Sequence, residues 1–249
     1  MKIFLAGASG VIDRLLVPLL RKAGHSIAGT TRASEKVAAV RALGADPGVV
    51  DVFDVAALSH AVAAAAPHVV IHQLTDLPSA PGTPGYEAGL ERNARLRIDG
   101  TRNLVTAAKA AGVQRLIAQS IAFIYAPAQG ARLESDPLDL AATGARKRTV
   151  EGVTALEQAT LSMPEGIVLR YGFLYGPGTW FEKEARAKPA LFVDAAAQAA
   201  LLALTKGRPG IYNVAEDDGA VSIEKARREL GFDPGFRGAA ADADERRCP

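Results

Sequence analysis

Residues 3–13 read Ile3-Phe4-Leu5-Ala6-Gly7-Ala8-Ser9-Gly10-Val11-Ile12-Asp13, an apolar run that breaks into a glycine-rich turn. Leucines at positions 15, 16, 19 and 20 then recur at helical spacing. In such a strand–turn–helix unit, Gly7 permits the tight turn and Gly10 lets backbone N–H groups approach a phosphate, while the helix N-terminus faces the negative charge. The opening therefore predicts a site for the diphosphate of a dinucleotide coenzyme.

The composition bounds the kind of protein. The chain has 249 residues, 49% hydrophobic and 22% charged, which is enough for one sizeable α/β domain with a small appended lobe. A net charge of +2 gives no reason to expect nucleic acid or an anionic membrane as a partner. The one cysteine, Cys248, excludes an intrachain disulfide. Because the chain enters its first strand at once, we expect no signal peptide and a cytoplasmic protein that acts on a small molecule, with a homodimer as a possible assembly.

Short apolar strands alternate with helical stretches along the chain, which predicts a Rossmann-like, doubly wound parallel sheet of about seven strands with a small C-terminal substrate lobe. We expect the strands at 3–6, 26–32, 48–53, 68–74, 115–120, 166–170 and 210–215. Ser34 and Asp54 are expected to cap the helices that follow the second and third strands. We assign 1–172 to the coenzyme-binding core, joined by 190–215, with 173–189 and 216–236 forming a reduced lobe and 237–249 a disordered tail.

With these units placed, the chain resembles the short-chain dehydrogenase/reductase superfamily, most closely its extended or atypical branch of NAD-dependent epimerases and dehydratases. Five segments carry the resemblance in the right order on the right elements: 7–10, 51–54, 100–104, 118–125 and 169–177. The resemblance covers the chain to about residue 236 and implies an NAD(P)-binding Rossmann fold.

The end of the second strand bears on the choice of coenzyme. An acidic residue there selects NAD through the ribose hydroxyl, whereas an arginine accommodates the 2′-phosphate of NADP. This chain carries Arg32 and no carboxylate in the strand, so we predict NADP, with NAD as second choice, unless Arg32 is only a solvated surface residue. The resemblance implies that Asp51 accepts a hydrogen bond from the adenine amino group. The full predicted coenzyme-binding set is Gly7, Ser9, Gly10, Val11, Ile12, Arg32, Asp51, Val52, Leu74 and Lys147.

Asp13 departs from the family pattern, which usually has a third glycine at this position. A carboxylate in the first helical turn suits the helix dipole but repels a diphosphate if it points into the site. We expect the side chain to point to solvent.

The catalytic apparatus is incomplete. The resemblance implies a serine, a tyrosine and a lysine, and Ser120 and Lys147 fit two of these positions, but Thr143 stands where the tyrosine belongs. An aliphatic hydroxyl is far less acidic than a phenol and cannot run the usual proton relay. Tyr125 or Tyr171 could substitute, or another group or water could act, or the protein could bind the coenzyme without turnover. The non-catalytic alternatives are that each tyrosine is only a packed aromatic ring and that Lys147 is only a solvated lysine on a helix. Our predicted catalytic set is Ser120, Lys147 and Tyr125.

Other chemistries are excluded. His68 and His72 fall on a strand, where four residues span about 13 Å, too far for one metal ion. Ser120 lacks the glycine-flanked elbow of a hydrolase. Trp180 could stack on a substrate ring or pack within the lobe. The sequence thus predicts an NADP-dependent oxidoreductase or epimerase/dehydratase-like protein for a small carbonyl or alcohol, or, as the alternative, a non-catalytic NAD(P)-binding regulator or interaction protein.

Overall fold

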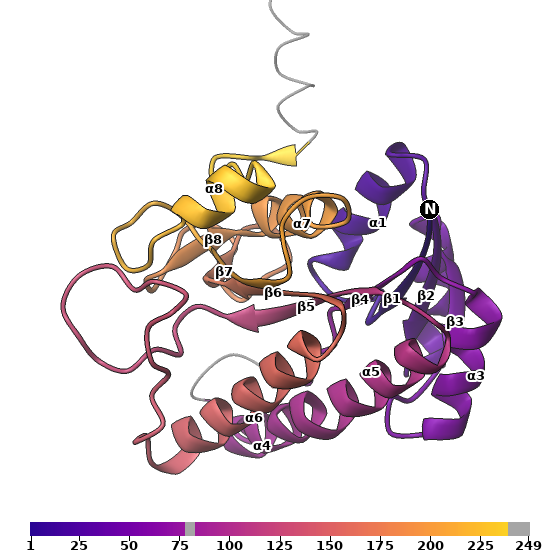
Figure 1. Cartoon of the computed structure of the whole chain (residues 1–249), viewed down its shortest axis with the longest axis horizontal. Helices are drawn as coiled ribbons and strands as arrows, with labels where there is room; N and C mark the ends of the chain where they lie inside the picture. Colours follow the sequence, from indigo (N-terminus) through magenta and orange to yellow (C-terminus); the bar gives the residue numbers. More distant parts are fainter. Residues whose placement is uncertain (78–82, 239–249) are drawn as a thin grey trace, which may run out of the picture.

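The computed structural model describes residues 1–77 and 83–238, and its centre is a seven-stranded parallel sheet (Figure 1). The strand order is β3-β2-β1-β4-β5-β6-β9, so β1 is third from one edge, and the strand order reverses between β1 and β4. The strands are β1 (Lys2–Ala6), β2 (Ser26–Thr31), β3 (Asp46–Val49), β4 (Val69–His72), β5 (Arg115–Ile121), β6 (Glu165–Tyr171) and β9 (Gly210–Val214). The predicted fold class is confirmed.

Helices cover both faces of the sheet (Figure 1). On one face lie α1 (Asp13–Lys22), α2 (Val37–Ala42) and α7 (Val193–Leu202), and α8 (Glu224–Leu230) packs at the same side. On the other lie α3 (Val55–Ala65), α4 (Tyr86–Arg95), α5 (Thr101–Ala110) and α6 (Gly144–Leu161). Successive residues of a strand point to opposite faces, so Ile3 joins the first core and Phe4 the second. This double burial is why the strands read as continuous apolar runs.

Several predicted elements are shifted or differ in kind. The third strand covers 46–49 rather than 48–53, and Ser34 begins a 3₁₀ turn (Ser34–Lys36) without capping a helix. Asp54 does cap α3, accepting from the Ala57 amide at 3.0 Å. The long helix after the fourth strand is one continuous run in which a π-helical segment, Leu96–Gly100, joins α4 to α5. A two-stranded parallel sheet of β7 (Phe173–Tyr175) and β8 (Ala190–Phe192) was not anticipated.

The C-terminal part is tied closely to the sheet. The Gly172 amide donates to Val214 O at 3.0 Å and the Glu216 amide donates to Ala190 O at 2.7 Å. Arg237, where we expected a disordered tail to begin, lies 4.3 Å above the Phe192 ring and 3.2 Å from Glu216. Residues 239–249 lie outside the described part of the chain. The division into core and reduced lobe stays a prediction.

In the described ranges, no helix has both the length and the apolar character that a membrane crossing requires.

Candidate functional site

The glycine-rich turn sits where β1 ends between β2 and β4. Gly7 has φ +102°, and a Cβ added there would lie 3.0 Å from the Gln73 carbonyl. The amides of Gly7 and Ala8 donate to Thr30 O at 3.2 and 2.9 Å, which fixes the turn against β2. A turn with no side chain at its closest approach, leading into a helix N-terminus, fits the diphosphate of a dinucleotide.

The rest of the turn divides into a polar and an apolar side. Ser9 Oγ lies 3.3 Å from Thr31 Oγ1, whereas Ile12 is buried in the core. Val11 faces the loop after β7, since a Cβ on Gly178 would come within 3.3 Å of its Cγ2. The loop that follows the sixth strand therefore packs onto the coenzyme turn.

The prediction that Asp13 points to solvent is wrong. Its side chain is 1% exposed, and Oδ1 has no hydrogen-bond partner in the described structure. Oδ2 would meet a Cβ on Gly10 at 2.7 Å, so the carboxyl group lies directly under the turn. Burial raises the pKa of Asp13 well above its usual range. Burial thus favours the neutral form of Asp13, and this form would not repel a diphosphate as a carboxylate would.

Arg32 reaches across the sheet edge from β2 to the loop after β4. Its Nη1 lies 3.0 Å from Asp76 Oδ2, and the guanidinium remains largely exposed. Arg92 of α4 lies 3.5 Å from the same oxygen, and the Asp76 amide donates to Asn93 Oδ1 at 2.9 Å. Because β1 lies between β2 and β4, the Arg32–Asp76 pair spans the edge from which the glycine turn rises.

Asp51, Val52 and Leu74 flank this edge. Asp51 is exposed and accepts from the Phe53 amide at 2.9 Å, while Val52 is buried against Gly100. The Leu74 amide donates to His72 Nδ1 at 3.2 Å. All three follow the ends of β3 or β4, so the structure brings them to the same edge as the turn.

Ser120 and Tyr125 meet in a buried polar network. Ser120 donates to Glu157 Oε1 at 2.8 Å, and Glu157 also binds Arg170 through both carboxylate oxygens, at 2.8 and 2.6 Å. Arg170 donates to Tyr125 Oη at 2.7 Å, and Tyr125 donates to Asn213 Oδ1 at 2.6 Å. Burial raises the pKa of Tyr125. Both hydroxyls are committed to protein partners and are not offered to a substrate.

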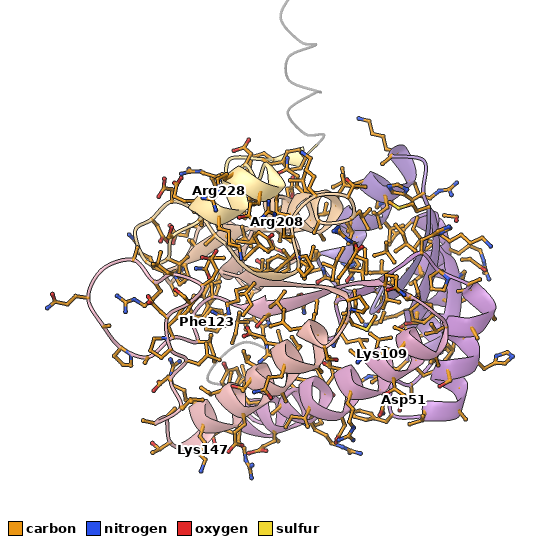
Figure 2. All side chains as sticks on the ribbon, viewed as in Figure 1. Asp51, Lys109, Phe123, Lys147, Arg208 and Arg228 are labelled. Carbon is orange, nitrogen blue, oxygen red and sulfur yellow. The ribbon has the colours of Figure 1, made fainter. Side chains whose placement is uncertain are left out.

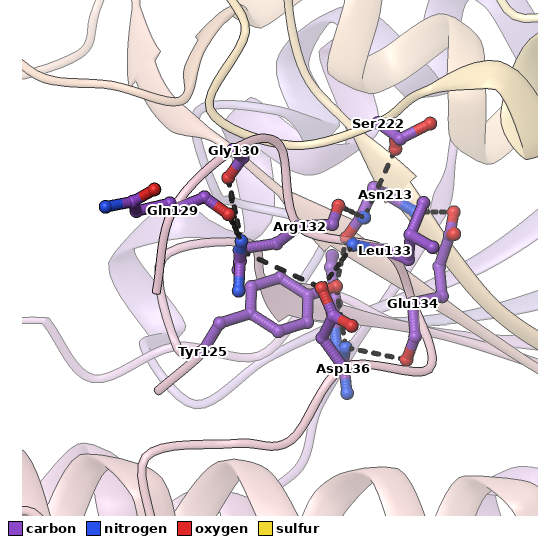
Figure 3. Close-up of polar contacts among 10 residues, drawn as sticks. Tyr125, Gln129, Gly130, Arg132, Leu133, Glu134, Asp136, Asn213 and Ser222 are labelled. Carbon is purple, nitrogen blue, oxygen red and sulfur yellow. Dashed lines mark hydrogen bonds and ion pairs between the residues drawn. The ribbon is translucent and has the colours of Figure 1, made fainter. Parts of the chain in front are cut away.

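The network extends to the loop before α6 (Figure 3). The side-chain amide of Asn213 donates to Arg132 O and Ser222 O, at 3.1 and 3.2 Å, and its backbone amide donates to Glu134 Oε1 at 2.9 Å. Tyr125 and its partners thus hold loop 126–140 against β9, which is a structural task.

Lys147 is not brought to the other two predicted catalytic residues. It lies exposed near the start of α6, and Figure 2 shows its side chain pointing away from the fold. Thr143 is also exposed and makes no capping bond. The buried positions of α6 are Val150, Gly152, Val153, Leu156, Glu157 and Thr160. None of these is a tyrosine or lysine, so the face of α6 turned to the sheet carries no proton relay of the family type.

The remaining aromatic and histidine side chains are engaged within the fold. Tyr171 donates to Ala196 O at 3.1 Å, and burial raises its pKa. His72 accepts at Nδ1 from Leu74, so its Nε2–H donates to Thr101 Oγ1 at 2.8 Å. His68 accepts from the Lys2 amide at 2.9 Å. In residues 1–77 and 83–238, no group of three potential metal ligands comes together.

Two features of this edge escaped sequence reasoning. Phe123 and Phe173, which follow the neighbouring strands β5 and β6, stack with centroids 3.7 Å apart and an interplanar angle of 12°. Arg97, in the π-helical segment, is only 7% exposed. Phenylalanines directly after two adjacent strands were a usable signal, whereas the burial of Arg97 had none.

Comparison with known proteins matches these features. A family model described as NAD(P)H-binding matches residues 7–161. A 3-diazoavenalumate denitrifying reductase from Streptomyces sp. is 39% identical over 259 residues, covering 94% of this chain and 83% of the relative.

Solved structures show the same fold. UDP-glucose 4-epimerase of Thermotoga maritima, with UDP-glucose, has a TM-score of 0.75 at 17% identity and covers 95% of this chain and 94% of its own. A short-chain dehydrogenase/reductase superfamily protein from Agrobacterium tumefaciens, with bound NAD, has a TM-score of 0.73 at 18% identity over 98% and 97% of the two chains. The chain belongs to the NAD(P)H-binding family and has the Rossmann fold of the short-chain dehydrogenases/reductases.

Proposed function

We propose that the protein is an NADP(H)-dependent reductase that replaces a diazo group on an aromatic or conjugated skeleton with hydrogen and releases N₂. The reaction class comes from the Streptomyces relative, whose name describes a reductase that denitrifies 3-diazoavenalumate. The observation that carries the proposal is the missing proton relay. Ser120 and Tyr125 are committed to Glu157 and Asn213, and the buried face of α6 offers no substitute.

The chemistry of the diazo group explains why a relay is dispensable. Reduction of a carbonyl consumes a hydride and a proton, because the oxygen that gains charge must be protonated. Bound NAD(P)H would supply the hydride, and for an arenediazonium ion the balanced reaction is Ar–N₂⁺ + H⁻ → Ar–H + N₂. The departing N₂ takes the electron pair of the broken C–N bond, so no oxyanion forms and no proton is consumed. A site without a phenol and lysine suits this reaction better than carbonyl reduction.

The aromatic edge supports a flat substrate. Diazonium groups persist only on aromatic or conjugated carbon, so the substrate must present a planar skeleton. The half-buried rings of Phe123 and Phe173 follow the ends of β5 and β6, at the edge where substrates of such sheets bind. Figure 2 labels Phe123. We assign them to the substrate's stacking surface.

The preference for NADP rests on Arg32. Its guanidinium stands exposed at the end of β2, and Asp76 retains Arg92 as a partner when Arg32 turns to a 2′-phosphate. We expect Arg32→Ala to weaken NADPH binding about tenfold, the worth of one charge-assisted hydrogen bond, and to leave NADH binding nearly unchanged. Arg92→Ala, which removes the other cation on Asp76, is the matched control and should not shift the ratio. Equal loss for both coenzymes in Arg32→Ala would contradict the assignment.

The reaction itself is tested with 4-carboxybenzenediazonium and NADPH deuterated at the transferable position. We expect benzoate with one deuterium, N₂ and NADP⁺ in equal amounts, and no rate change in D₂O. Gly7→Val provides the blank for uncatalysed reduction, since a side chain there meets the Gln73 carbonyl. Turnover of aldehydes and ketones alone would overturn the diazo assignment. Coenzyme binding without turnover of either class would identify a non-catalytic NAD(P)-binding protein.

A further inference from the structure

Arg97 is a buried cation without a partner. Its side chain is 7% exposed, yet within residues 1–77 and 83–238 it makes neither a hydrogen bond nor an ion pair. The π-helical segment that carries it is a rare interruption of a helix, of the kind often found at functional sites. In the described part of the chain, the nitrogens of Arg97 are not among the fully buried atoms that lack a partner, so the guanidinium keeps a narrow contact with solvent through which an anion could reach it.

Arg97 lies about one helical turn before Thr101, whose hydroxyl is 2.8 Å from His72 Nε2 at the end of β4, and this contact places Arg97 near that end of the sheet. Its charge contributes to the lowered pKa of His72 at the end of β4, and it is itself coupled to Glu157 of α6. Glu157 accepts hydrogen bonds from Ser120, near the end of β5, and from Arg170, near the end of β6, so its carboxylate lies close to the ends of both strands. The glycine turn, by contrast, follows β1. Arg97 therefore lies beyond the diphosphate cradle, toward the strands that carry the Phe123–Phe173 stack.

The buried charges do not balance. Four ionisable acids and bases that are normally charged are buried in the described chain: Asp13, Arg97, Glu157 and Arg170. Burial favours the neutral form of Asp13, and Arg170 donates to both carboxylate oxygens of Glu157. Desolvation lowers the pKa of Arg97 only to about 10, so the residue stays cationic at neutral pH. One positive charge is left uncompensated, which is costly unless an anion joins it.

We propose that Arg97 is the anion-binding residue of the substrate site and that it takes a carboxylate of an aromatic or conjugated acid. A planar guanidinium matches the two oxygens of a carboxylate with paired hydrogen bonds. The inference deepens the proposed function by naming the substrate class as acidic, but its test needs no turnover.

The probes are 4-hydroxycinnamate and its methyl ester, which share a flat skeleton and differ in charge. Each is titrated by calorimetry into the protein saturated with NADP⁺, in wild type, Arg97→Met, Arg97→Lys and Arg95→Met. Arg95 is the matched control, because it lies two residues away on the same helical run with an exposed side chain. We expect wild type and Arg95→Met to bind the acid at least about tenfold more tightly than the ester, Arg97→Met to lose this preference, and Arg97→Lys to recover part of it.

Two outcomes overturn the inference. Either Arg97→Met keeps the preference for the acid, or it binds NADPH about tenfold more weakly while the acid-to-ester ratio is unchanged, which would assign Arg97 to a coenzyme phosphate. Circular dichroism and NADPH binding confirm that each variant is folded. If no diazonium compound is reduced but the acid preference depends on Arg97, the proposed reaction fails and this site stands.

Discussion

At the scale of single residues, buried ionisable groups dominate the site edge. Burial favours the neutral forms of Asp13 and His72, and Glu157 accepts two hydrogen bonds from Arg170. Neutralisation and pairing are the two ways in which a protein interior tolerates such groups. Each makes a distinct prediction for stability.

Asp13→Asn is expected to stabilise the protein at neutral pH. The unfolded carboxyl loses its proton near pH 4, whereas the folded one keeps it because burial raises the pKa of Asp13. Above about pH 4 the folded state therefore binds more protons, and wild-type stability falls by up to about 1.4 kcal/mol per pH unit until the native pKa is reached. Urea unfolding from pH 4 to 8 should show the variant gaining on wild type as pH rises. Parallel profiles would contradict a protonated Asp13.

Glu157→Gln is expected to cost about 3 kcal/mol or more of unfolding free energy. The substitution leaves Arg170 as a buried cation without its bidentate partner. Ser120→Ala removes one hydrogen bond to the same carboxylate and should cost only about 1 kcal/mol. Denaturant unfolding of the two variants separates them. A larger loss from Ser120→Ala would show that the serine, not the ion pair, organises the network.

At the scale of elements, two contacts between a strand and a helix, which we call joints, fix the helices relative to the sheet. One ties β4 to α5 through His72 and Thr101, and the other is the close approach of β6 to the end of α6.

The first joint predicts acid sensitivity. Burial and the charge of Arg97 lower the pKa of His72 from 6.5 to about 4. The unfolded state binds a proton below pH 6.5 that the folded state refuses, so stability falls between about pH 6.5 and 4, by about 3 kcal/mol in total. His72→Asn should lack this decline. Because Asp13 acts with the opposite sign in the same window, the measurement is the difference between wild type and His72→Asn across the pH range. A constant difference would mean that the pKa of His72 is the same in the folded and unfolded states.

The second joint predicts that Gly166→Ala is severely destabilising. A Cβ at this position of β6 would clash with the carbonyl oxygen of Thr160, which is a backbone atom and cannot rotate away. Gly48→Ala in β3 is the matched control, because its nearest atoms are 3.8 and 3.9 Å distant. We expect a loss of several kcal/mol for the first and a near-neutral or slightly positive effect for the second, from thermal unfolding. Similar melting temperatures for both would contradict the close approach.

These joints also mark where sequence reasoning stops. The central strands could be predicted from the sequence because burial on both faces makes them continuous apolar runs. The turn after β1 could be predicted because its backbone conformation requires glycine. Ser120 looked available because it stands at the end of a strand, but side chains alternate, and a one-residue difference decides which face a hydroxyl meets. It faces Glu157, a residue 37 positions away. Similarly, the sequence spacing could align Lys147 with a catalytic lysine, yet it could not reveal that the Lys147 side chain is exposed to solvent near the start of α6.

At the scale of the whole molecule, the predicted lobe and the sheet are interlocked. Hydrogen bonds from Glu216 to Ala190, from Ala190 to Asp218 and from Ser222 to Arg132 run between them. The lobe is consequently expected to unfold with the core in one transition. Trp180, the one tryptophan in the chain, lies in residues 173–189 and reports the lobe by fluorescence, while far-ultraviolet circular dichroism reports the core. The two thermal curves should coincide, and an earlier fluorescence transition would indicate a lobe that melts alone.

The contacts of Arg237 with Phe192 and Glu216 determine where the C-terminus can be truncated or fused to another segment without loss of an interaction. A purification tag or reporter fused directly after Phe236 would remove Arg237, the cation that stacks on Phe192 of β8 and pairs with Glu216. A fusion made after Arg237, or at any later residue, keeps these contacts. Deletion series made from the C-terminal end are therefore best read as two classes, divided at this arginine.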